Sequence, residues 1–347
     1  MRAVVTHRAG TMRLVDVPEP AEPGPGQVLV RPEAVGICGS DFHFLTGELV
    51  TPPAFGPQFP RVQGHEVAAR VVALGPGCPP GLRVGQRVAL FPMAWCGECY
   101  PCTHGRRNAC PNFRIIGVHV EGALADYLTV AGEQVFPVAD LDAPLAAFCE
   151  PVSIAVHAVE RGEVREGEPV VVLGGGPIGQ SVALCALDRG ARVLLTDLVA
   201  SRLELARANG VEVVNAAKAD AVATARGWAG PAGPPVVFEC VGLPGTVRQA
   251  VDMVSSAGRV VIVGIGHEEV RLPINAFTER ELSLLGSTVC TREDFAEAIR
   301  VVGAHREAVA RLITHERPLD DAVDAIAHAM ANPDEVMKLV IRGEAQI

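Results

Sequence analysis

The sequence predicts a two-domain α/β protein, in which a β-rich first part precedes a doubly wound parallel sheet. Its 347 residues exceed what one ordinary hydrophobic core accommodates, so two domains are expected. Apolar residues make up 49% and charged residues 20%, as in globular proteins. Near residue 150 the pattern also changes from isolated β-type runs to apolar strands that alternate with helices.

The first part predicts a small, irregular, β-barrel-like domain. Fifteen of the 27 prolines come before residue 112, and short β-type runs there are bounded by Gly or Pro. These runs cover residues 27–31, 68–74 and 87–91.

The second part predicts a parallel sheet buried on both faces, because continuous apolar strands alternate with segments of helical length. The strands are expected at 170–173, 193–196, 236–240 and 260–263, and helices at 178–189, 201–209 and 246–256. The rhythm is lost after residue 286, and we expect the chain to return to the first domain there. The predicted domains are therefore 1–149, 150–286 and the returning segment 287–347.

A glycine-rich turn follows the first of these strands. Gly174, Gly176 and Gly179 have the spacing of a dinucleotide-binding fingerprint, with Pro177 and Ile178 inside it. The three glycines would allow the tight turn, the approach of a pyrophosphate and close packing of the helix, whose N-terminus faces the phosphates. A plain tight turn is the alternative reading.

The strand after the glycine turn ends at an acid, which favours NAD as the cofactor. Asp197 would accept hydrogen bonds from the adenosine ribose and repel a 2′-phosphate. Arg202 leaves NADP open, or is a surface charge. Four residues after later strands are expected to contact the cofactor, the last three through their backbone near the nicotinamide carboxamide unless they form an ordinary strand end: Val241, Val263, Gly264 and Ile265.

Four cysteines lie close together in a lobe at about 92–112. Cys96, Cys99, Cys102 and Cys110 can wrap a tetrahedral ion, and a closed four-sulfur shell is typical of structural zinc. Gly and Pro residues between them suggest a loop that depends on metal for order. The alternatives are an iron–sulfur cluster, which can use similar spacing, and a reduced loop without metal.

A second group of metal-ligating residues is spread along the first domain. Cys38, His65, Glu66 and Glu150 supply one thiolate, one imidazole and two carboxylates. Zinc held by three protein groups keeps a fourth position for water or substrate, as in catalytic sites. Taken singly, a buried Cys or a lone His is more often structural.

Together these motifs resemble the zinc-containing medium-chain alcohol dehydrogenases. The sequence is most similar to the branch of sorbitol (polyol) and L-gulonate or L-galactonate 5-dehydrogenases. The resemblance covers essentially the whole chain and implies a GroES-like catalytic domain, a Rossmann domain inserted before the last portion, and a homodimer or homotetramer. It rests on residues 36–41, 64–66, the cysteine lobe, Glu150–Pro151 and the glycine turn; relatives often carry Gly where this chain has Ala69 and Ala123.

The resemblance also implies roles for individual residues. Cys38 and His65 would bind the catalytic zinc, and either Glu66 or Glu150 would be the third ligand. Asp41 would orient His65. Two further residues, Ser40 and His43, match positions that relay the alcohol proton to solvent, although His43 can also be read as a surface residue.

The implied reaction is oxidation of a secondary hydroxyl, with zinc as Lewis acid and NAD as hydride acceptor, in the cleft between the domains. A sugar-acid substrate needs a cation, and Arg292 and Arg114 are candidates. Three aromatic residues of the first domain can wall a pocket or pack in its core: Phe44, Phe55 and Phe59.

Other classes of function are disfavoured. A formal charge of −10 argues against nucleic acid or an anionic membrane as partner. No secretory signal is visible, so we expect a cytoplasmic enzyme with two zinc ions per chain and a small polar alcohol as substrate. The alternatives are an enzyme like L-threonine 3-dehydrogenase and a non-enzymatic descendant that binds zinc or NAD.

Overall fold

The computed structural model describes residues 1–48, 58–138, 140–266 and 268–343, so Phe55 lies outside the described residues. The chain forms two compact units, one of residues 1–150 with 298–347 and one of residues 151–297. The second boundary therefore differs from the predicted one after residue 286. The reason is packing: Cys290 and Asp294 contact the side chains of Ser153 and His157, which belong to the second unit.

The first unit is built on a seven-stranded sheet, in the order β10-β6-β5-β3-β18-β17 with β9 also paired to β3. The last strand of the chain pairs antiparallel with β3, so the C-terminal segment joins the sheet of the N-terminal part. The strands are β3 (Gln27–Gly36), β5 (Glu66–Leu74), β6 (Arg87–Leu90), β9 (Leu128–Ala131), β10 (Val135–Pro137), β17 (His315–Pro318) and β18 (Leu339–Arg342).

Two smaller sheets and several short helices complete this unit. One sheet joins β2 (Thr11–Asp16), β1 (Arg2–Arg8) and β4 (Arg61–Val62), and the other joins β7 (Met93–Ala94) and β8 (Arg114–Ile115). The helices are α1 (Gly39–Thr46), α2 (Tyr100–Thr103), α3 (Ala143–Ala147), α11 (Arg306–Leu312) and α12 (Ala322–Ala331).

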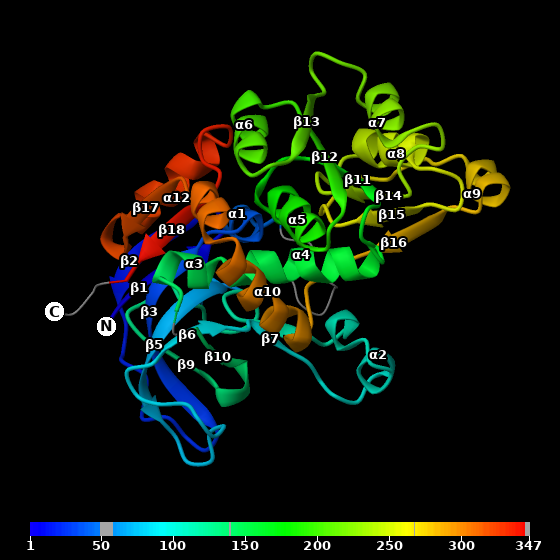
Figure 1. The fold of residues 1–347 in the computed structure, drawn as a ribbon. Coiled ribbons are helices and arrows are strands. Elements are labelled where there is room, and N and C mark those ends of the chain that lie inside the picture. Colours follow the sequence, from blue (N-terminus) through cyan, green and yellow to red (C-terminus); the bar gives the residue numbers. More distant parts are fainter. Residues whose placement is uncertain (49–57, 139, 267, 344–347) are drawn as a thin grey trace. The chain divides into compact units, whose positions relative to one another are not determined.

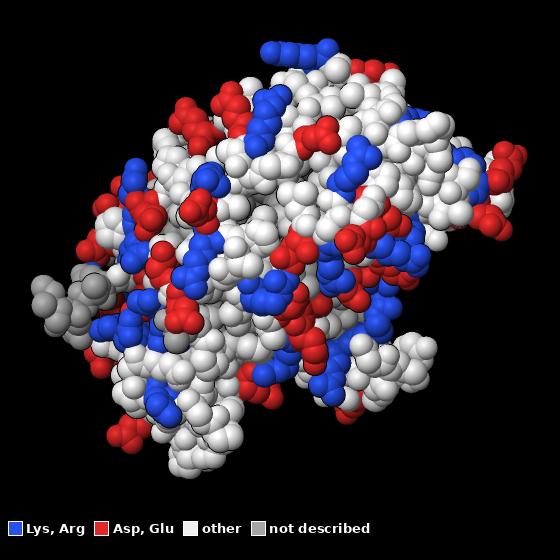
Figure 2. Space-filling view, in the orientation of Figure 1, with Lys and Arg blue, Asp and Glu red and all other residues white. Residues whose placement is uncertain are grey.

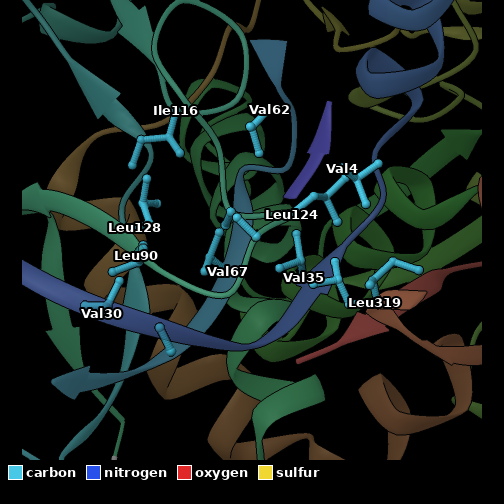
Figure 3. Packing of buried hydrophobic residues seen from close by; sticks show 14 of the residues in the cluster. Val4, Val30, Val35, Val62, Val67, Leu90, Ile116, Leu124, Leu128 and Leu319 are labelled. Atoms are coloured by element: carbon cyan, nitrogen blue, oxygen red, sulfur yellow. The ribbon is translucent and has the colours of Figure 1, made fainter. Parts of the chain in front are cut away.

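The core of the first unit consists of aliphatic side chains from several strands (Figure 3). Val4, Val30 and Leu90 are fully buried. Buried and half-buried positions alternate along β3, as expected of a strand with one face on the core. Because a core of this kind holds β3 and β5 rigidly, residues at their ends make a firm base for a site.

The second unit is a six-stranded parallel sheet in the order β13-β12-β11-β14-β15-β16 (Figure 1). Counted within this unit, the strand order is 3-2-1-4-5-6, the arrangement of Rossmann domains. The strands are β11 (Pro169–Leu173), β12 (Arg192–Asp197), β13 (Glu212–Asn215), β14 (Val236–Glu239), β15 (Arg259–Ile262) and β16 (Ser283–Gly286).

Helices connect these strands and leave the carboxyl ends of the strands at one edge of the sheet, where such folds bind ligands. Gly174, Asp197 and Glu239 all stand at that edge, at or directly after the ends of three neighbouring strands. The helices are α5 (Pro177–Asp188), α6 (Ala200–Ala208), α7 (Ala221–Ala229), α8 (Pro244–Met253) and α9 (Ile274–Arg280), with α4 (Cys149–Arg161) and α10 (Arg292–Ala304) beside the unit boundaries.

The surface gives little support for a polyanionic partner. Figure 2 shows basic and acidic side chains interspersed over the face in view, with no large patch of basic charge there. Within the described ranges, none of the helices has the length and apolar character needed to cross a bilayer.

Candidate metal centres and nucleotide site

The first candidate metal centre begins where β3 leads into α1. Cys38 is the residue that precedes α1, and its backbone N–H donates to Asp41 Oδ2 at 2.9 Å. This hydrogen bond satisfies a backbone donor at the helix start and fixes the turn that carries the thiol. The local fold thus sets the direction of Cys38 without help from a metal.

His65 and Glu66 stand at the beginning of β5, after Gly64. Gly64 has a φ of +95°, and a Cβ there would lie 2.7 Å from a methyl group of Val35, so the turn requires glycine. The ligand atoms of Cys38, His65 and Glu66 all lie within 4.8 Å of one another. One sulfur, one imidazole nitrogen and one carboxylate oxygen suit zinc.

The His65 ring is oriented by its neighbours. Its Nδ1 atom lies 3.6 Å from Asp41 Oδ1, which leaves Nε2 for a metal, and Ser40 Oγ is 3.4 Å from Nε2. Burial alone would lower the pKa of His65, but Asp41 and Cys38 outweigh it and raise the pKa well above its usual value. Asp41 and Ser40 thus lie near opposite nitrogens of the His65 imidazole, and their predicted roles in orienting His65 and relaying a proton stay predictions.

Asp41 is itself held by residues that the sequence analysis missed. Gln63 Nε2 donates to the backbone oxygen of Asp41 at 2.9 Å and lies 3.3 Å from Oδ1. Thr6 Oγ1 donates to Gln63 Oε1 at 2.6 Å. Asp41, Gln63 and Thr6 are all buried, so the network behind His65 is rigid. No motif marks Gln63 or Thr6 as site residues.

Lys338 is the largest surprise at this centre. Its Nζ donates to both carboxylate oxygens of Glu66, at 2.7 and 2.8 Å, and to the backbone oxygen of Ile37 at 3.0 Å. Glu66 is 1% and Lys338 3% exposed. Burial alone would lower the pKa of Lys338, but Glu66 outweighs it and raises that pKa. A metal bound at this centre would therefore share Glu66 with a buried ammonium group.

Glu150 lies in the first turn of α4 and is buried. Burial raises the pKa of Glu150 to about 7, with His65 opposing that rise and the like charge of Glu66 adding to it. Among the described residues, the three-residue group within 4.8 Å does not include Glu150. His43, half-buried, lies on α1 three residues after Ser40.

The second candidate metal centre is the four-cysteine lobe. The ligand atoms of Cys96, Cys99, Cys102 and Cys110 also lie within 4.8 Å of one another. The Cys110 sulfur lies 3.5 Å from that of Cys96 and 3.7 Å from that of Cys99. Backbone N–H groups of Glu98 and Cys99 lower the pKa of Cys96 to about 6, which favours the thiolate that zinc binds. Four converging sulfurs fit a closed structural site.

The glycine turn has the geometry that nucleotide binding requires. Gly174 has a φ of +96°, and a Cβ on Gly179 would lie 1.8 Å from the Gly174 carbonyl oxygen, so neither position accepts a side chain. A Cβ on Gly176 would meet nothing within 4 Å, so the backbone there is open to a ligand. Pro177 opens α5, with Ile178 in the same turn, and Gly176 precedes the helix. The helix N-terminus is thus free of side-chain caps, as a phosphate site needs.

Asp197 faces this turn. Its Oδ2 accepts from the Gly175 N–H at 2.6 Å and its Oδ1 from the Val199 N–H at 2.8 Å. The guanidinium of Arg202 lies 3.8 Å from Oδ2. The carboxylate is therefore fixed beside the glycine turn, with a cation close to it.

The loop after β14 is held by a buried acid that the sequence analysis did not single out. Glu239 accepts from the backbone of Val241 and Gly242 and from Thr246 Oγ1. Its backbone oxygen accepts from the N–H groups of Val263 and Gly264, at 2.8 and 2.9 Å. Those two N–H groups are thus engaged within the protein, which leaves the carbonyl groups and Ile265 for the predicted contact with the carboxamide.

The residues predicted to bind the substrate do not form a single cluster, unlike the predicted metal ligands. Arg292 opens α10 and is half-buried, whereas Arg114 in β8 is exposed. Phe44 is fully buried and packs edge-to-face on Phe59, with ring centroids 5.1 Å apart, so it has the packing role. The predicted site in a cleft between the domains stays a prediction, since each unit is described by itself.

Comparisons with known proteins identify the family. Residues 24–140 match the alcohol dehydrogenase GroES-like domain, and residues 177–304 match the zinc-binding dehydrogenase domain. The 2-dehydro-3-deoxy-L-galactonate 5-dehydrogenase of Pseudoalteromonas atlantica is 34% identical over 92% of each chain. The L-galactonate-5-dehydrogenase of Escherichia coli K12 is 32% identical, also over 92% of each.

A solved structure agrees over the full length. A chain from Sinorhizobium meliloti 1021, described as a zinc-binding dehydrogenase and bound to NADP, is 33% identical with a TM-score of 0.87, over 98% of each chain. The protein thus belongs to the zinc-type medium-chain alcohol dehydrogenases, in the polyol and sugar-acid branch, and is an enzyme. The predicted family and fold class are confirmed, and the non-enzymatic alternative is wrong.

Proposed function

We propose that the protein transfers hydride from a secondary alcohol of a polyol or sugar acid to NAD, with one zinc ion at Cys38, His65 and a carboxylate, and a second in the cysteine lobe. The observation that carries the proposal is the convergence of a thiol, an imidazole and a carboxylate within 4.8 Å. Zinc in such a site acts as a Lewis acid that favours loss of the hydroxyl proton near neutral pH.

The protein's own residues would hold and move that proton. Ser40 Oγ, 3.4 Å from His65 Nε2, is next to the proposed metal position and would accept the hydroxyl proton while it gives up its own. His43, one helical turn further along α1, would pass it on toward solvent. Asp41 would keep His65 in the tautomer that offers Nε2 to the metal.

NAD is the proposed cofactor because Asp197 ends β12 beside the glycine turn, and an acid at that place in a Rossmann domain binds the ribose hydroxyls and repels a 2′-phosphate. Gly175 fixes the Asp197 carboxylate at the glycine turn, and a phosphate there would be repelled. Arg202, 3.8 Å away, limits this preference. The bound NADP of the Sinorhizobium meliloti relative makes the preference worth testing directly.

The test of the cofactor proposal is Asp197→Ala. We expect the KM for NAD to rise about tenfold, because hydrogen bonds to a charged group are lost. The preference for NAD over NADP should fall with it. Asp220→Asn, at the start of α7 in the same unit, is the matched control and should change neither value. An unchanged preference in Asp197→Ala would assign cofactor choice to other residues.

The proposed substrate class follows from the carboxylate-containing metal site and the two galactonate dehydrogenases among the relatives. Arg292 is the proposed partner of a substrate carboxylate. It opens the 13-residue helix α10, and the positive end of a helix adds to its attraction for an anion. A forked guanidinium can also bind a carboxylate through two hydrogen bonds.

The deciding experiment is a screen of NAD reduction over polyols, aldonic acids and L-threonine. We expect turnover with polyols or aldonic acids and little with L-threonine. Turnover with L-threonine alone would overturn the substrate class but keep the zinc and cofactor sites. The proposed homo-oligomer and cytoplasmic location are separate predictions that this screen does not address.

A further inference from the structure

One face of α4 carries three side chains that bind the stretch from the last residue of β16 to the first turn of α10. Ser153 Oγ donates to Cys290 Sγ at 3.1 Å, and Arg161 Nε donates to the Gly286 carbonyl oxygen at 3.3 Å. Between them, His157 Nδ1 lies 2.8 Å from Asp294 Oδ2. The three residues are four apart, the spacing at which side chains share one face of a helix. They line up this segment along α4.

Asp294 also builds the start of α10. Its Oδ2 accepts from the backbone N–H and the hydroxyl of Thr291, both at 2.8 Å, and Thr291 Oγ1 accepts from the Asp294 N–H at 3.1 Å. This is a reciprocal capping box, which satisfies two backbone donors at the helix start. The same oxygen therefore receives donors from Thr291 and from His157.

The His157–Asp294 pair is buried, and the carboxylate of Asp294 is ionised. His157 is 7% and Asp294 9% exposed. Burial alone would raise the pKa of Asp294, but hydrogen bonds from His157 and Thr291 outweigh it and lower that pKa. An ionised carboxylate in such a place needs its donors, since a buried charge without partners is costly. Capping needs only Thr291, so the hydrogen bond with His157 additionally ties the start of α10 to α4.

This tie bears on Arg292, one of the two residues between the capping partners. Arg292 is the first residue of α10, directly after Thr291 and two before Asp294. Any shift of the capping box along α4 would move the Arg292 backbone with it. The other end of α4 carries Glu150 in its first turn. One helix thus bears a candidate metal ligand and holds the turn that presents the candidate substrate arginine.

We propose that His157 and Asp294 are a positioning pair, which holds Arg292 in place to receive the carboxylate of a sugar-acid substrate. This inference rests on the proposed function, because it assumes a substrate with a carboxylate. Neither residue of the pair touches the substrate. Their effect is on how well Arg292 is placed, so it concerns acidic substrates and not neutral ones.

The experiment compares L-gulonate with sorbitol, which lacks a carboxylate, in wild type, His157→Phe and His157→Gln. Phe keeps the bulk of the ring without the donor, whereas the Gln amide retains a donor. For His157→Phe we expect the KM for L-gulonate to rise about tenfold, the range of one hydrogen bond to a charged group. Its kcat and the KM for sorbitol should stay within about twofold, and His157→Gln should recover most of the loss.

Two controls separate positioning from general damage. Arg161→Met removes a neighbouring contact of α4 that does not reach the capping box, and should leave both KM values within about twofold. Zinc content and the thermal unfolding temperature are measured for every variant. Should His157→Phe fail to fold, the comparison is made with Asp294→Asn, which keeps an acceptor for Thr291 but lowers the charge that binds His157.

A double-mutant cycle tests the link to Arg292. Arg292→Lys alone should raise the KM for L-gulonate, and adding His157→Phe should then raise it by less than about twofold, because both changes act on one interaction. Full additivity, or an equal rise for sorbitol, would overturn the positioning pair. A wild type that oxidises no sugar acid refutes the proposed substrate class, whereas an active wild type with an unaffected His157→Phe refutes only the pair.

Discussion

The two candidate metal centres use the same soft ligand but differ in what surrounds it. In the cysteine lobe four sulfurs converge within 4.8 Å, and backbone N–H groups favour the thiolate of Cys96. At the other centre only Cys38 is a sulfur, and a buried lysine occupies both oxygens of Glu66. The four cysteines would fill all four positions of a tetrahedral metal, whereas the three ligands of the other group would leave one coordination position free.

A metal at the Cys38 centre would keep a free coordination position for two reasons. The centre has fewer sulfur ligands than the cysteine lobe, and Lys338 would compete with the metal for Glu66. Zinc keeps a position for substrate only when its protein ligands do not close the tetrahedron. The centre at Cys38 has two acids nearby, Glu66 and Glu150, and would be closed if both bound the metal. Lys338 holds Glu66 by two hydrogen bonds and would therefore weaken the binding of Glu66 to a metal.

The largest effect should come from Cys38→Ser. Loss of the only sulfur at the open centre should lower kcat by about a thousandfold or more, since the Lewis acid is lost. The fold should remain, because the hydrogen bond from the Cys38 backbone to Asp41 does not involve the thiol. Metal analysis should find one zinc per chain in place of two. Unchanged zinc content with full activity would refute the open centre.

These residues show how much of the site could be predicted from the sequence. The four predicted strands of the parallel sheet are present to within one residue at each end, because buried strands have continuous apolar runs. The sequence analysis did not mark β13 and β16, which are short and carry exposed residues. The four cysteines lie together in space, and so do Cys38, His65 and Glu66, whereas Glu150 is not in the second group. Metal binding at both centres stays a prediction.

Lys338 and Gln63 could not be predicted. Lys338 is 272 residues from Glu66 in the sequence and lies just before β18, and only the pairing of β18 with β3 brings it to the site. Gln63 directly precedes Gly64 but belongs to no recognisable motif. Its role depends on its buried side-chain amide, which donates a hydrogen bond to Asp41. Residues that act through the positions of others have no signature in one sequence, whereas metal ligands do.

Lys338→Met should have the next largest effect and tests the competition directly. In protein stripped of metal it leaves Glu66 buried without a partner, so stability should fall by about 3 to 5 kcal/mol. With zinc bound the loss should be smaller, since the ion replaces the ammonium as countercharge. Urea unfolding with and without a chelator measures the difference.

The control for Lys338→Met is Lys218→Met, which changes the only other lysine of the chain, at an exposed position. It should lower stability by less than about 0.5 kcal/mol, as is usual for surface substitutions. An equal loss for Lys338→Met with and without zinc would show that the lysine does not compete with the metal for Glu66.

Cys99→Ser should affect stability but much less the chemistry. A loop that depends on its metal for order loses that order when one of four sulfurs is removed, so we expect the thermal unfolding temperature to fall by about 2 to 4 °C for each kcal/mol of stability lost. The kcat of the chains that remain folded should stay within about threefold. A thousandfold loss of kcat, at an unchanged unfolding temperature, would reverse the roles of the two centres.

The smallest expected effect is a change in how zinc affinity depends on pH. It should differ between the two centres because their ligands release different protons. Burial raises the pKa of Glu150 to about 7, and the pKa of His65 is raised well above its usual value, so near neutral pH metal-free protein holds a proton on His65 and part of one on Glu150. Zinc must displace protons from its ligands, so affinity at the open centre should rise between pH 6 and 8. Below the pKa of a ligand, where metal-free protein holds the proton, each proton that zinc releases corresponds to about a tenfold rise in zinc affinity per pH unit. Glu150→Gln should flatten this rise by up to one proton, while zinc in the cysteine lobe keeps its pH dependence. If the slope of zinc affinity against pH does not change in Glu150→Gln, Glu150 neither binds the metal nor loses its proton when the metal binds. Glu66 would then be the third ligand despite its hydrogen bonds with Lys338.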